Sequence, residues 1–275
     1  MVNDDCQMQK LLVIKIGGNI IDDESKLSAF LKEFASIASK KILVHGGGKL
    51  ATKMATQLNV PQQMVEGRRI TDAETLKIVT MVYAGLINKN IVAQLQAAGC
   101  NAIGLSGADA NVILAHKRLP KNSRSGDRDL DYGYAGDVDE VNAEFLHSLL
   151  GQSLSPVLAP ITHDKKGQLL NTNADTIAQE TAKALSEFYD VHLIYSFEKS
   201  GVLLDAADEN SVIPLVNKTR YQDLKEKELV FAGMIPKIDN AFSALQSGVK
   251  KVIIGNAENL KALVEGSAGT TIVNE

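Results

Sequence analysis

The sequence predicts an α/β fold: a three-layer αβα sandwich with a mainly parallel central sheet. Short apolar runs alternate along the chain with segments whose apolar residues recur every three or four positions. Glycine-rich turns join several of these runs to the helices that follow. The 275 residues suffice for a sizeable core. Strands that alternate with helices indicate a largely parallel sheet covered on both faces, with ligands at the carboxyl ends of the strands.

The N-terminal part of the chain predicts a βαβ unit. The apolar run 11–16 indicates a buried strand that ends in the Gly17-Gly18 turn. Apolar residues at helical spacing between 27 and 37 predict a helix. A second strand at 42–44 then leads into Gly46-Gly47-Gly48. Two glycine turns are therefore expected at one edge of the sheet.

The remaining elements continue the alternation. The predicted helices cover residues 49–58, 72–98, 174–186 and 237–246, and the predicted strands include 103–105, 156–160, 192–195 and 252–254. Residues 117–136 are charged and rich in turn formers, which predicts a polar hairpin or lid.

Composition excludes several classes of protein. The net charge of -4 gives no general attraction to polyanions, and the basic residues between 117 and 128 alternate with acidic ones, so we expect no nucleic-acid partner. The sequence holds no apolar run of about 20 residues and no basic N-terminal leader, so we expect a cytoplasmic protein without a membrane partner. Cys6 and Cys100 lack metal-ligand spacing and are interpreted as incidental thiols.

Two glycine turns, Gly17-Gly18-Asn19 and Gly46-Gly47-Gly48, each follow a strand and open a helix. Backbone N–H groups at such turns bind anions, and the pair together suits a polyphosphate. Neither turn fits the P-loop pattern or the dinucleotide-binding fingerprint. Each turn taken alone could instead be an ordinary tight turn.

Three charged residues are candidates for phosphate chemistry. Lys15 lies in an apolar strand beside the first glycine turn, where a phosphate would offset the burial of its ammonium group; alternatively its side chain extends to solvent. Lys237 opens a helix, from which it reaches a phosphate or remains a solvated lysine. Asp175 either caps the helix that follows it or orients the two lysines.

Several motifs occur in the order seen in acetylglutamate kinases, and the sequence resembles that family over nearly its whole length. The motifs are Ile14-Lys15-Ile16-Gly17-Gly18, Val44-His45-Gly46-Gly47-Gly48, Gly67-Arg68-Arg69-Ile70-Thr71, Asn88-Lys89, Gly104-Leu105-Ser106-Gly107-Ala108-Asp109, Asn171-Thr172-Asn173-Ala174-Asp175 and Gly233-Met234-Ile235-Pro236-Lys237. The Lys-Gly-Gly and Met-x-x-Lys elements resemble those of the wider amino-acid kinase family, whose fold the resemblance implies.

The resemblance implies catalytic roles. Lys15 and Lys237 would stabilise the transferring phosphoryl group, and Asp175 would hold the lysines in place. Gly17 and Gly18 would contact ATP phosphates.

The resemblance also implies substrate contacts. Arg69 and Asn171 would hold the α-carboxylate, for which the planar arginine fork is suited. Gly47, Gly48 and Asn173 would complete the acceptor site. Arg69 could alternatively be a plain surface arginine.

The nucleotide region departs from the family pattern. Phe197-Glu198-Lys199-Ser200-Gly201 stands where the family usually has Ser/Thr-Asp-Val before a glycine. Glu198 and Gly201 are the expected ATP contacts, and Lys199 could face the nucleotide. No general base is required, because a carboxylate acceptor is already ionised. His45 is therefore interpreted as a structural strand-end residue.

The implied function is ATP- and Mg²⁺-dependent phosphorylation of the side-chain carboxylate of N-acetyl-L-glutamate or N-succinyl-L-glutamate, as in arginine biosynthesis. Basic residues Lys117, Arg118, Arg124 or Arg128 could favour the longer succinyl group. The alternatives are another member of the amino-acid kinase family and a catalytically silent nucleotide-binding regulatory protein.

The resemblance also implies the organisation of the chain. Residues 1–275 would form a single amino-acid kinase domain, with an N-lobe at 1–173 for the acyl glutamate and the dimer interface, and a C-lobe at 174–275 for ATP. The short segment before the first strand resembles members that are homodimers insensitive to arginine. The apolar stripe of the predicted helix 72–98 offers a two-fold interface or ordinary core packing.

Overall fold

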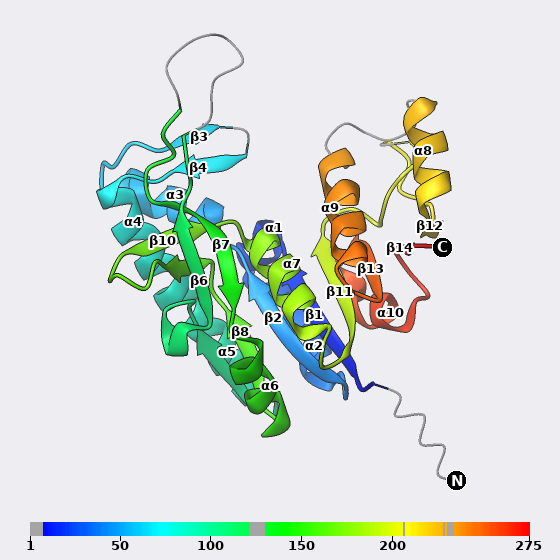
Figure 1. Ribbon diagram of the computed structural model, residues 1–275, viewed down its shortest axis with the longest axis horizontal. Coiled ribbons are helices and arrows are strands. Elements are labelled where there is room, and N and C mark those ends of the chain that lie inside the picture. The colour runs from blue at the N-terminus through cyan, green and yellow to red at the C-terminus, as the bar shows by residue number, and fades with distance from the viewer. Residues whose placement is uncertain (1–7, 66, 121–129, 206, 228, 230–233) are drawn as a thin grey trace.

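An eight-stranded sheet runs through the centre of the protein, as the computed structural model in Figure 1 shows. The structure describes residues 8–65, 67–120, 130–205, 207–227, 229 and 234–275. The strand order is β12-β14-β13-β11-β1-β2-β8-β5. The bounds are β1 Lys10–Ile16, β2 Lys40–His45, β5 Ala102–Leu105, β8 Ser155–Leu158, β11 Asp190–Phe197, β12 Leu215–Val216, β13 Lys251–Asn256 and β14 Thr270–Ile272.

All neighbouring strands in this sheet are parallel except β13 and β14. Ile16 at the end of β1 pairs with His45 of β2 and with Ser196 of β11. The carboxyl ends of three central strands therefore lie side by side, and both glycine turns begin there. The predicted parallel sheet is confirmed.

Helices cover both faces of the sheet. Their bounds are α1 Gly18–Ile21, α2 Glu24–Ser36, α3 Gly48–Gln57, α4 Ala73–Thr80, α5 Asn88–Ala97, α6 Ala143–Gly151, α7 Ala174–Leu185, α8 Lys218–Glu226, α9 Ile235–Gln246 and α10 Leu260–Glu265. Short 3₁₀ turns occupy Asp109–Asn111 and Ala257–Asn259. Helix α2 contacts both α5 and α10 on one face, whereas α6, α7 and α9 pack on the other.

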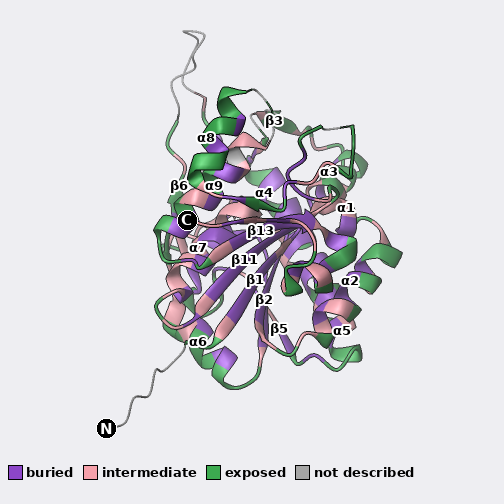
Figure 2. Cartoon of the chain, turned by 90° about the vertical axis from the view of Figure 1, so that its right-hand side faces the viewer, coloured by how far each residue is buried: buried purple, intermediate pink, exposed green. Residues whose placement is uncertain are grey.

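Alternate residues of β1 belong to two separate cores. Leu11 and Val13 face the core beneath α6, α7 and α9, whereas Leu12 and Ile14 face the core beneath α2 and α5. All four are fully buried, as expected for a strand covered on both sides. Figure 2 shows the buried strands between helices whose outer surfaces are exposed. The three-layer αβα sandwich is thus confirmed. The division of the chain into lobes at 1–173 and 174–275 remains a prediction.

A small barrel lies beside the main sheet, in the strand order β10-β7-β6-β9. Its strands are β6 Ile113–Lys117, β7 Ala135–Val141, β9 Ile161–His163 and β10 Leu169–Thr172. The antiparallel strands β6 and β7 flank the predicted hairpin excursion at 117–136, of which residues 121–129 lie outside the described residues. A separate two-stranded sheet joins β3 Gln63–Val65 to β4 Arg68–Ile70.

The predicted long helix is continuous from Ala73 to Ala97, but its middle, Met81–Ile87, is a π-helix. Asp72 caps its first turn, where its carboxylate accepts a hydrogen bond from Thr75 N. Among the described residues this is the one helix long and apolar enough to cross a bilayer. Most of its apolar residues, among them Val79, Val82 and Ile91, pack in the core beside α2, whereas Met81 and Leu86 are exposed.

Of the two cysteines, Cys100 is buried and free. Cys6 lies outside the described residues.

Candidate active site

An ion pair joins β1 to α7 at the carboxyl edge of the sheet. Lys15 Nζ lies 2.7 Å from Asp175 Oδ1, and the two side chains are 17% and 35% exposed. The ammonium group is therefore neutralised by a neighbouring carboxylate and does not extend freely to solvent. Both groups still have access to the surface, so a bound anion could contact the lysine.

The alternative in which Asp175 caps helix α7 is wrong. The N-cap is Asn173, whose side-chain Oδ1 accepts hydrogen bonds from Asp175 N at 2.8 Å and Thr176 N at 3.2 Å. The Asp175 carboxylate is thereby free to face Lys15. Asn173 thus acts as the cap that aims Asp175 at the edge of the sheet.

Lys237 lies in the first turn of α9, and its Nζ lies 4.2 Å from the centre of the Phe197 ring at the end of β11. Burial lowers the pKa of Lys237, and Lys15 lowers it further, while Asp175 and Glu198 act in the opposite direction. Lys237 is therefore within electrostatic range of the Lys15–Asp175 pair. The alternative of a fully solvated lysine does not fit its partial burial. Gly233 of the same motif lies outside the described residues.

The two glycine turns lie on either side of this charged group. Gly17 N donates to Ser196 O at 3.0 Å, which fixes the first turn against β11. Gly47 has a φ of +144°, and a Cβ atom there would lie 2.2 Å from Ile87 Cδ1. Only glycine fits this position without displacing Ile87. Gly18 and Gly48 are the first residues of α1 and α3.

A cleft of about 180 Å³ opens beside the second glycine turn. Its lining residues come from both glycine-turn and barrel elements: Gly46, Gly47, Gly48, Met64, Gly67, Arg68, Arg69, Tyr83, Ala135, Pro160, Asn171, Thr172, Asn173 and Ala174. Predicted substrate residues Gly47, Gly48, Arg69, Asn171 and Asn173 all lie here.

Arg69 is held firmly within the cleft wall. Its Nη2 donates to Gly48 O at 2.9 Å and to Thr52 Oγ1 at 3.0 Å, and its Nη1 donates to Gln62 Oε1. The residue is only 7% exposed, so the plain surface alternative is wrong. Burial raises the pKa of the Tyr83 hydroxyl, and the adjacent Arg69 guanidinium opposes that rise.

Asn171 is oriented by a contact with the β4 side of the cleft. Its Nδ2 donates to Thr71 Oγ1 at 3.0 Å, which leaves its amide oxygen as an acceptor on the cleft side. Two main-chain bonds tie this wall to the segment before β7: Thr71 N donates to Tyr132 O at 3.0 Å, and Tyr134 N donates to Thr71 O at 2.6 Å. The cleft wall is thus a preorganised set of polar groups.

A second cleft, of about 310 Å³, lies in the C-terminal half. Its lining residues are Ser200, Val212, Pro214, Asn256, Asn259, Ser267, Ala268 and Gly269. From the segment with the atypical sequence, 197–201, Ser200 belongs to this lining. Predicted ATP residues Glu198 and Gly201 belong to this segment but not to the lining.

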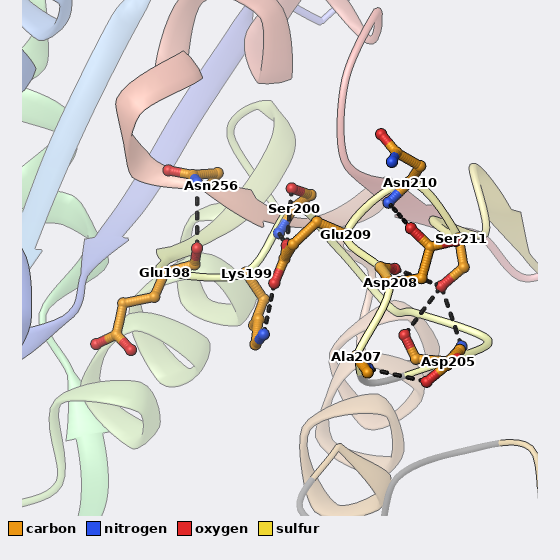
Figure 3. Close-up of polar contacts among 10 residues, drawn as sticks. All are labelled: Glu198, Lys199, Ser200, Asp205, Ala207, Asp208, Glu209, Asn210, Ser211 and Asn256. Atoms are coloured by element: carbon orange, nitrogen blue, oxygen red, sulfur yellow. Dashed lines mark hydrogen bonds and ion pairs between the residues drawn. The ribbon is translucent and has the colours of Figure 1, made fainter.

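Figure 3 shows how the atypical segment is held. Asn256 Nδ2 donates to the Glu198 carbonyl at 3.1 Å. The Glu209 carboxylate accepts hydrogen bonds from Ser200 N at 3.2 Å and Ser200 Oγ at 3.0 Å, and pairs with Lys199. Lys199 is therefore paired with Glu209, and a contact between Lys199 and the nucleotide stays a prediction.

Gly201 has a packing reason of its own. A Cβ atom there would lie 2.7 Å from Thr270 Oγ1, and the next residue, Val202, donates from its N to that same oxygen at 2.8 Å. The glycine lets the segment lie directly on β14.

Sequence reasoning missed Tyr83, Glu209 and Asn256 as residues that shape this region, and it named Asn88 only within a family motif, without a role. Tyr83 and Asn88 lie in the predicted helix 72–98, whose apolar stripe indicates core packing, and Glu209 lies in a polar turn without periodicity. The adjacent Asn88-Lys89 pair within an apolar helix was the available signal. Among the described residues there is no cluster of three or more His, Cys, Asp or Glu side chains suited to hold a metal ion.

Comparisons with known proteins agree with this geometry. Residues 10–256 match the profile of the amino acid kinase family. The chain is 55% identical to the acetylglutamate kinase of Cytophaga hutchinsonii, with 97% of this chain and 99% of that protein covered. It is 54% identical to the acetylglutamate kinase of Phocaeicola vulgatus, with 96% and 98% covered.

Solved structures resemble the fold. A crystal structure from Streptococcus mutans has a TM-score of 0.75 at 30% identity and covers 97% of this chain and 99% of that one. The carbamate kinase of Giardia lamblia bound to AMP-PNP has a TM-score of 0.70 at 14% identity, with 98% and 99% covered, and shares the fold. The near-complete match to the family profile and to these relatives shows that the chain belongs to the amino acid kinase family.

Proposed function

We propose that the protein is an acetylglutamate kinase, which transfers the γ-phosphoryl group of ATP to the side-chain carboxylate of N-acetyl-L-glutamate in arginine biosynthesis. The single observation that carries this proposal is the Lys15–Asp175 ion pair at the carboxyl edge of the sheet, with Lys237 within its electrostatic range. The names of the curated relatives, at more than 50% identity, support the substrate.

The proposed mechanism relies on positioning and charge. Phosphoryl transfer spreads negative charge over the equatorial oxygens of the transferring group, and two lysines next to each other at the sheet edge would neutralise it. Asp175 would keep the two ammonium groups close together. Because Gly17 N already donates to Ser196 O, the backbone N–H groups of Gly18 and Gly47 would hold phosphate and acceptor oxygens. The acceptor carboxylate needs no base because it is ionised at neutral pH.

We propose that Arg69 and Asn171 together bind the α-carboxylate of the acceptor. The Arg69 guanidinium is already fixed by three hydrogen bonds, so little of its freedom is lost on binding. Asn173 would act through the cap that aims Asp175. Gly48 contributes its carbonyl to Arg69.

ATP would enter from the C-terminal cleft, with its phosphates directed to the two lysines. We propose that Glu198 faces the nucleotide and that Gly201 allows the chain to pass close to β14. Mg²⁺ would arrive with the nucleotide, because this ion commonly binds through substrate phosphates and retains several waters.

The acyl group is the part of the substrate that requires a direct test. Lys117 pairs with Asp131 and Arg118 with Asp137, so neither is an obvious partner for a succinyl carboxylate. Arg124 and Arg128 lie outside the described residues. These contacts favour the acetyl group.

One observation favours N-succinyl-L-glutamate as a second candidate. Arg68 lines the same cleft as Arg69, and a succinyl group carries the terminal carboxylate that a guanidinium binds. A kcat/KM at least about tenfold higher for the succinyl substrate, about 1.4 kcal/mol of transition-state discrimination, would identify it as the preferred acceptor.

The test is ATP-dependent hydroxamate formation with purified protein and a panel containing N-acetyl-, N-succinyl- and unacylated L-glutamate. We expect turnover with an acyl glutamate and little with glutamate itself. Turnover only with a carbamate or a nucleoside monophosphate would identify a different kinase of the family. Nucleotide binding without turnover of any acceptor would identify a silent binding protein.

We also propose a cytoplasmic homodimer. ATP and biosynthetic intermediates are cytoplasmic, and the long helix exposes two large apolar side chains, Met81 and Leu86, at 57% and 53% exposure. Two exposed apolar side chains on one helix suit a two-fold contact between copies. A monomer by light scattering at micromolar concentration would contradict the dimer.

A further inference from the structure

His45 ends strand β2 directly before the second glycine turn and is fully buried. Both of its ring nitrogens have partners. Nδ1 lies 2.8 Å from the Gly46 carbonyl oxygen, and Nε2 lies 3.2 Å from Asn88 Nδ2. The imidazole therefore bridges the glycine turn and the long helix.

The orientation of the Asn88 amide is fixed by two other contacts. Asn88 Nδ2 donates to the Val157 carbonyl at 3.0 Å, and Lys89 Nζ donates to Asn88 Oδ1 at 3.1 Å. A carbonyl accepts and an ammonium donates, so the amide cannot be reversed without losing both bonds. Asn88 must then donate to His45 Nε2, and the proton of the neutral ring resides on Nδ1. The Nδ1–H group donates to Gly46 O.

The ring is neutral at physiological pH. Burial lowers the pKa of His45 to about 4, and the nearby Lys89 lowers it as well, whereas the hydrogen bond to Gly46 opposes the shift. A neutral imidazole carries one N–H group, and the hydrogen bonds of Asn88 determine that this group is Nδ1–H.

The same helix contacts the glycine turn a second time. Within the π-helical turn, hydrogen bonds run from residue i to i+5, which widens the turn and changes which side chains share a face. Ile87 and Tyr83 both pack against Gly47. A Cβ atom on Gly47 would lie 2.2 Å from Ile87 Cδ1 and 3.2 Å from Tyr83 Cδ1. The helix thus fixes Gly46 through hydrogen bonds and Gly47 through packing.

We propose that His45 and Asn88 are positioning residues of the phosphoryl-transfer site: Asn88 sets the Nδ1–H tautomer of His45, and that N–H fixes the glycine turn whose backbone contacts the reacting oxygens. This inference deepens the proposed function and rests on it for its kinetic consequence. Small errors of position in such a site cost large factors in rate, on the order of 10²-fold per ångström.

The test compares two substitutions of the same residue. In His45→Asn the amide nitrogen stands near the position of Nδ1 and can still donate to Gly46. In His45→Gln the amide stands near Nε2 and keeps only the contact with Asn88. We expect His45→Gln to lower kcat by about tenfold or more relative to His45→Asn, with KM for ATP changed less than twofold.

His192→Gln is the matched control. His192 lies at the opposite end of the sheet in β11, is buried, and has its pKa lowered to about 4 by burial, as His45 does. The His192→Gln variant should be less stable than the unaltered protein but should keep the same kcat per folded molecule. Equal kcat values for the two His45 variants, measured well below their melting temperatures, would overturn the inference.

A measurement on the unaltered protein covers the case in which a variant does not fold. The ¹⁵N chemical shifts of the His45 ring distinguish a protonated Nδ1 from a protonated Nε2. A protonated Nδ1 is expected, and a protonated Nε2 would overturn the inference. Both outcomes are independent of turnover, so failure of the proposed kinase activity remains distinguishable from failure of this assignment.

Discussion

The lysine in β1 shows how one side chain can carry both a structural and a chemical role. An ammonium group near the end of a buried strand is costly without an anion close by. Asp175 supplies that anion at 2.7 Å. A phosphate would take up the same charge during catalysis. From the sequence, Asp175 could either cap helix α7 or orient the lysines. Because Asn173 is the N-cap of α7, the carboxylate of Asp175 is left to pair with Lys15.

Lys237 and Arg69 should have separable kinetic effects. Lys237→Ala is expected to lower kcat by about 10² or more with a modest change in KM, because its ammonium group would act on charge that develops in the transition state. Steady-state kinetics with both substrates measures this split. Lys225→Ala, an exposed lysine on the neighbouring helix α8, is the control and should leave kcat unchanged.

Arg69→Ala should instead raise KM for the acyl glutamate by about 10- to 100-fold, as expected for the loss of hydrogen bonds to a charged group. Arg220→Ala on α8 is the matched arginine control. A variant at Arg69 that lost kcat while keeping KM would show that the arginine acts on the phosphoryl group.

His45 also predicts a dependence of stability on pH. Its pKa is about 4 in the folded protein and about 6.5 in an unfolded chain. Between those values the unfolded state binds more protons, so the free energy of unfolding decreases as pH falls from 6.5 to 4. The full contribution is about 3 kcal/mol. Urea unfolding at pH 4.5 and 7 should show a smaller pH dependence in His45→Asn, and an unchanged dependence would contradict the assigned burial.

At the level of elements, the π-helical segment Met81–Ile87 joins core packing to the glycine turn. Apolar periodicity predicts a helix over 72–98 but does not reveal a local change of hydrogen-bond register. The segment places the Ile87 side chain in the space that is open because Gly47 has no Cβ atom.

Gly47→Ala should therefore raise KM for the acyl glutamate and destabilise the protein, because its Cβ would lie 2.2 Å from Ile87 Cδ1 and its φ is +144°. Adding Ile87→Ala should restore part of the lost binding by removing the clash, and a double-mutant cycle gives the coupling. Gly151→Ala, where a Cβ meets nothing within 4 Å, is the control. Strictly additive effects would show that the two residues are independent.

The Glu209 contacts make a second element-scale prediction. Glu209→Gln weakens the acceptor for Lys199 and for Ser200, which lines the C-terminal cleft. KM for ATP should rise several-fold while KM for the acyl glutamate stays constant. Glu265→Gln at the end of α10 is the control. An equal rise in both KM values would show a general loss of structure.

At the scale of the whole molecule, alternating apolar runs and helical stripes predicted the sheet and its two covered faces. The small barrel was not predicted as such, because its strands β9 and β10 have only 3 and 4 residues and their pairing is non-local. Strands of this length carry too few residues for a period of two to be distinguished.

The site was predicted to a similar extent. Local patterns within the sequence predicted the glycine turns, Lys15, Asp175 and Lys237. Contacts such as those of Asn88 with His45 join residues 43 positions apart, and no local pattern encodes them. The tautomer of His45 follows only from the contacts of Asn88 in three dimensions.

The central claim is that this site forms an acyl phosphate on the side chain of an acylated glutamate. The most direct measurement is ³¹P NMR of purified protein mixed with ATP, Mg²⁺ and N-acetyl-L-glutamate, with N-acetyl-L-glutamine as the matched substrate whose side chain lacks a carboxylate. We expect ADP and a new acyl-phosphate resonance with the glutamate compound only, and neither signal in Lys15→Ala. ATP left intact with both N-acetyl- and N-succinyl-L-glutamate, or cleaved to inorganic phosphate equally with the glutamine compound, would contradict the claim.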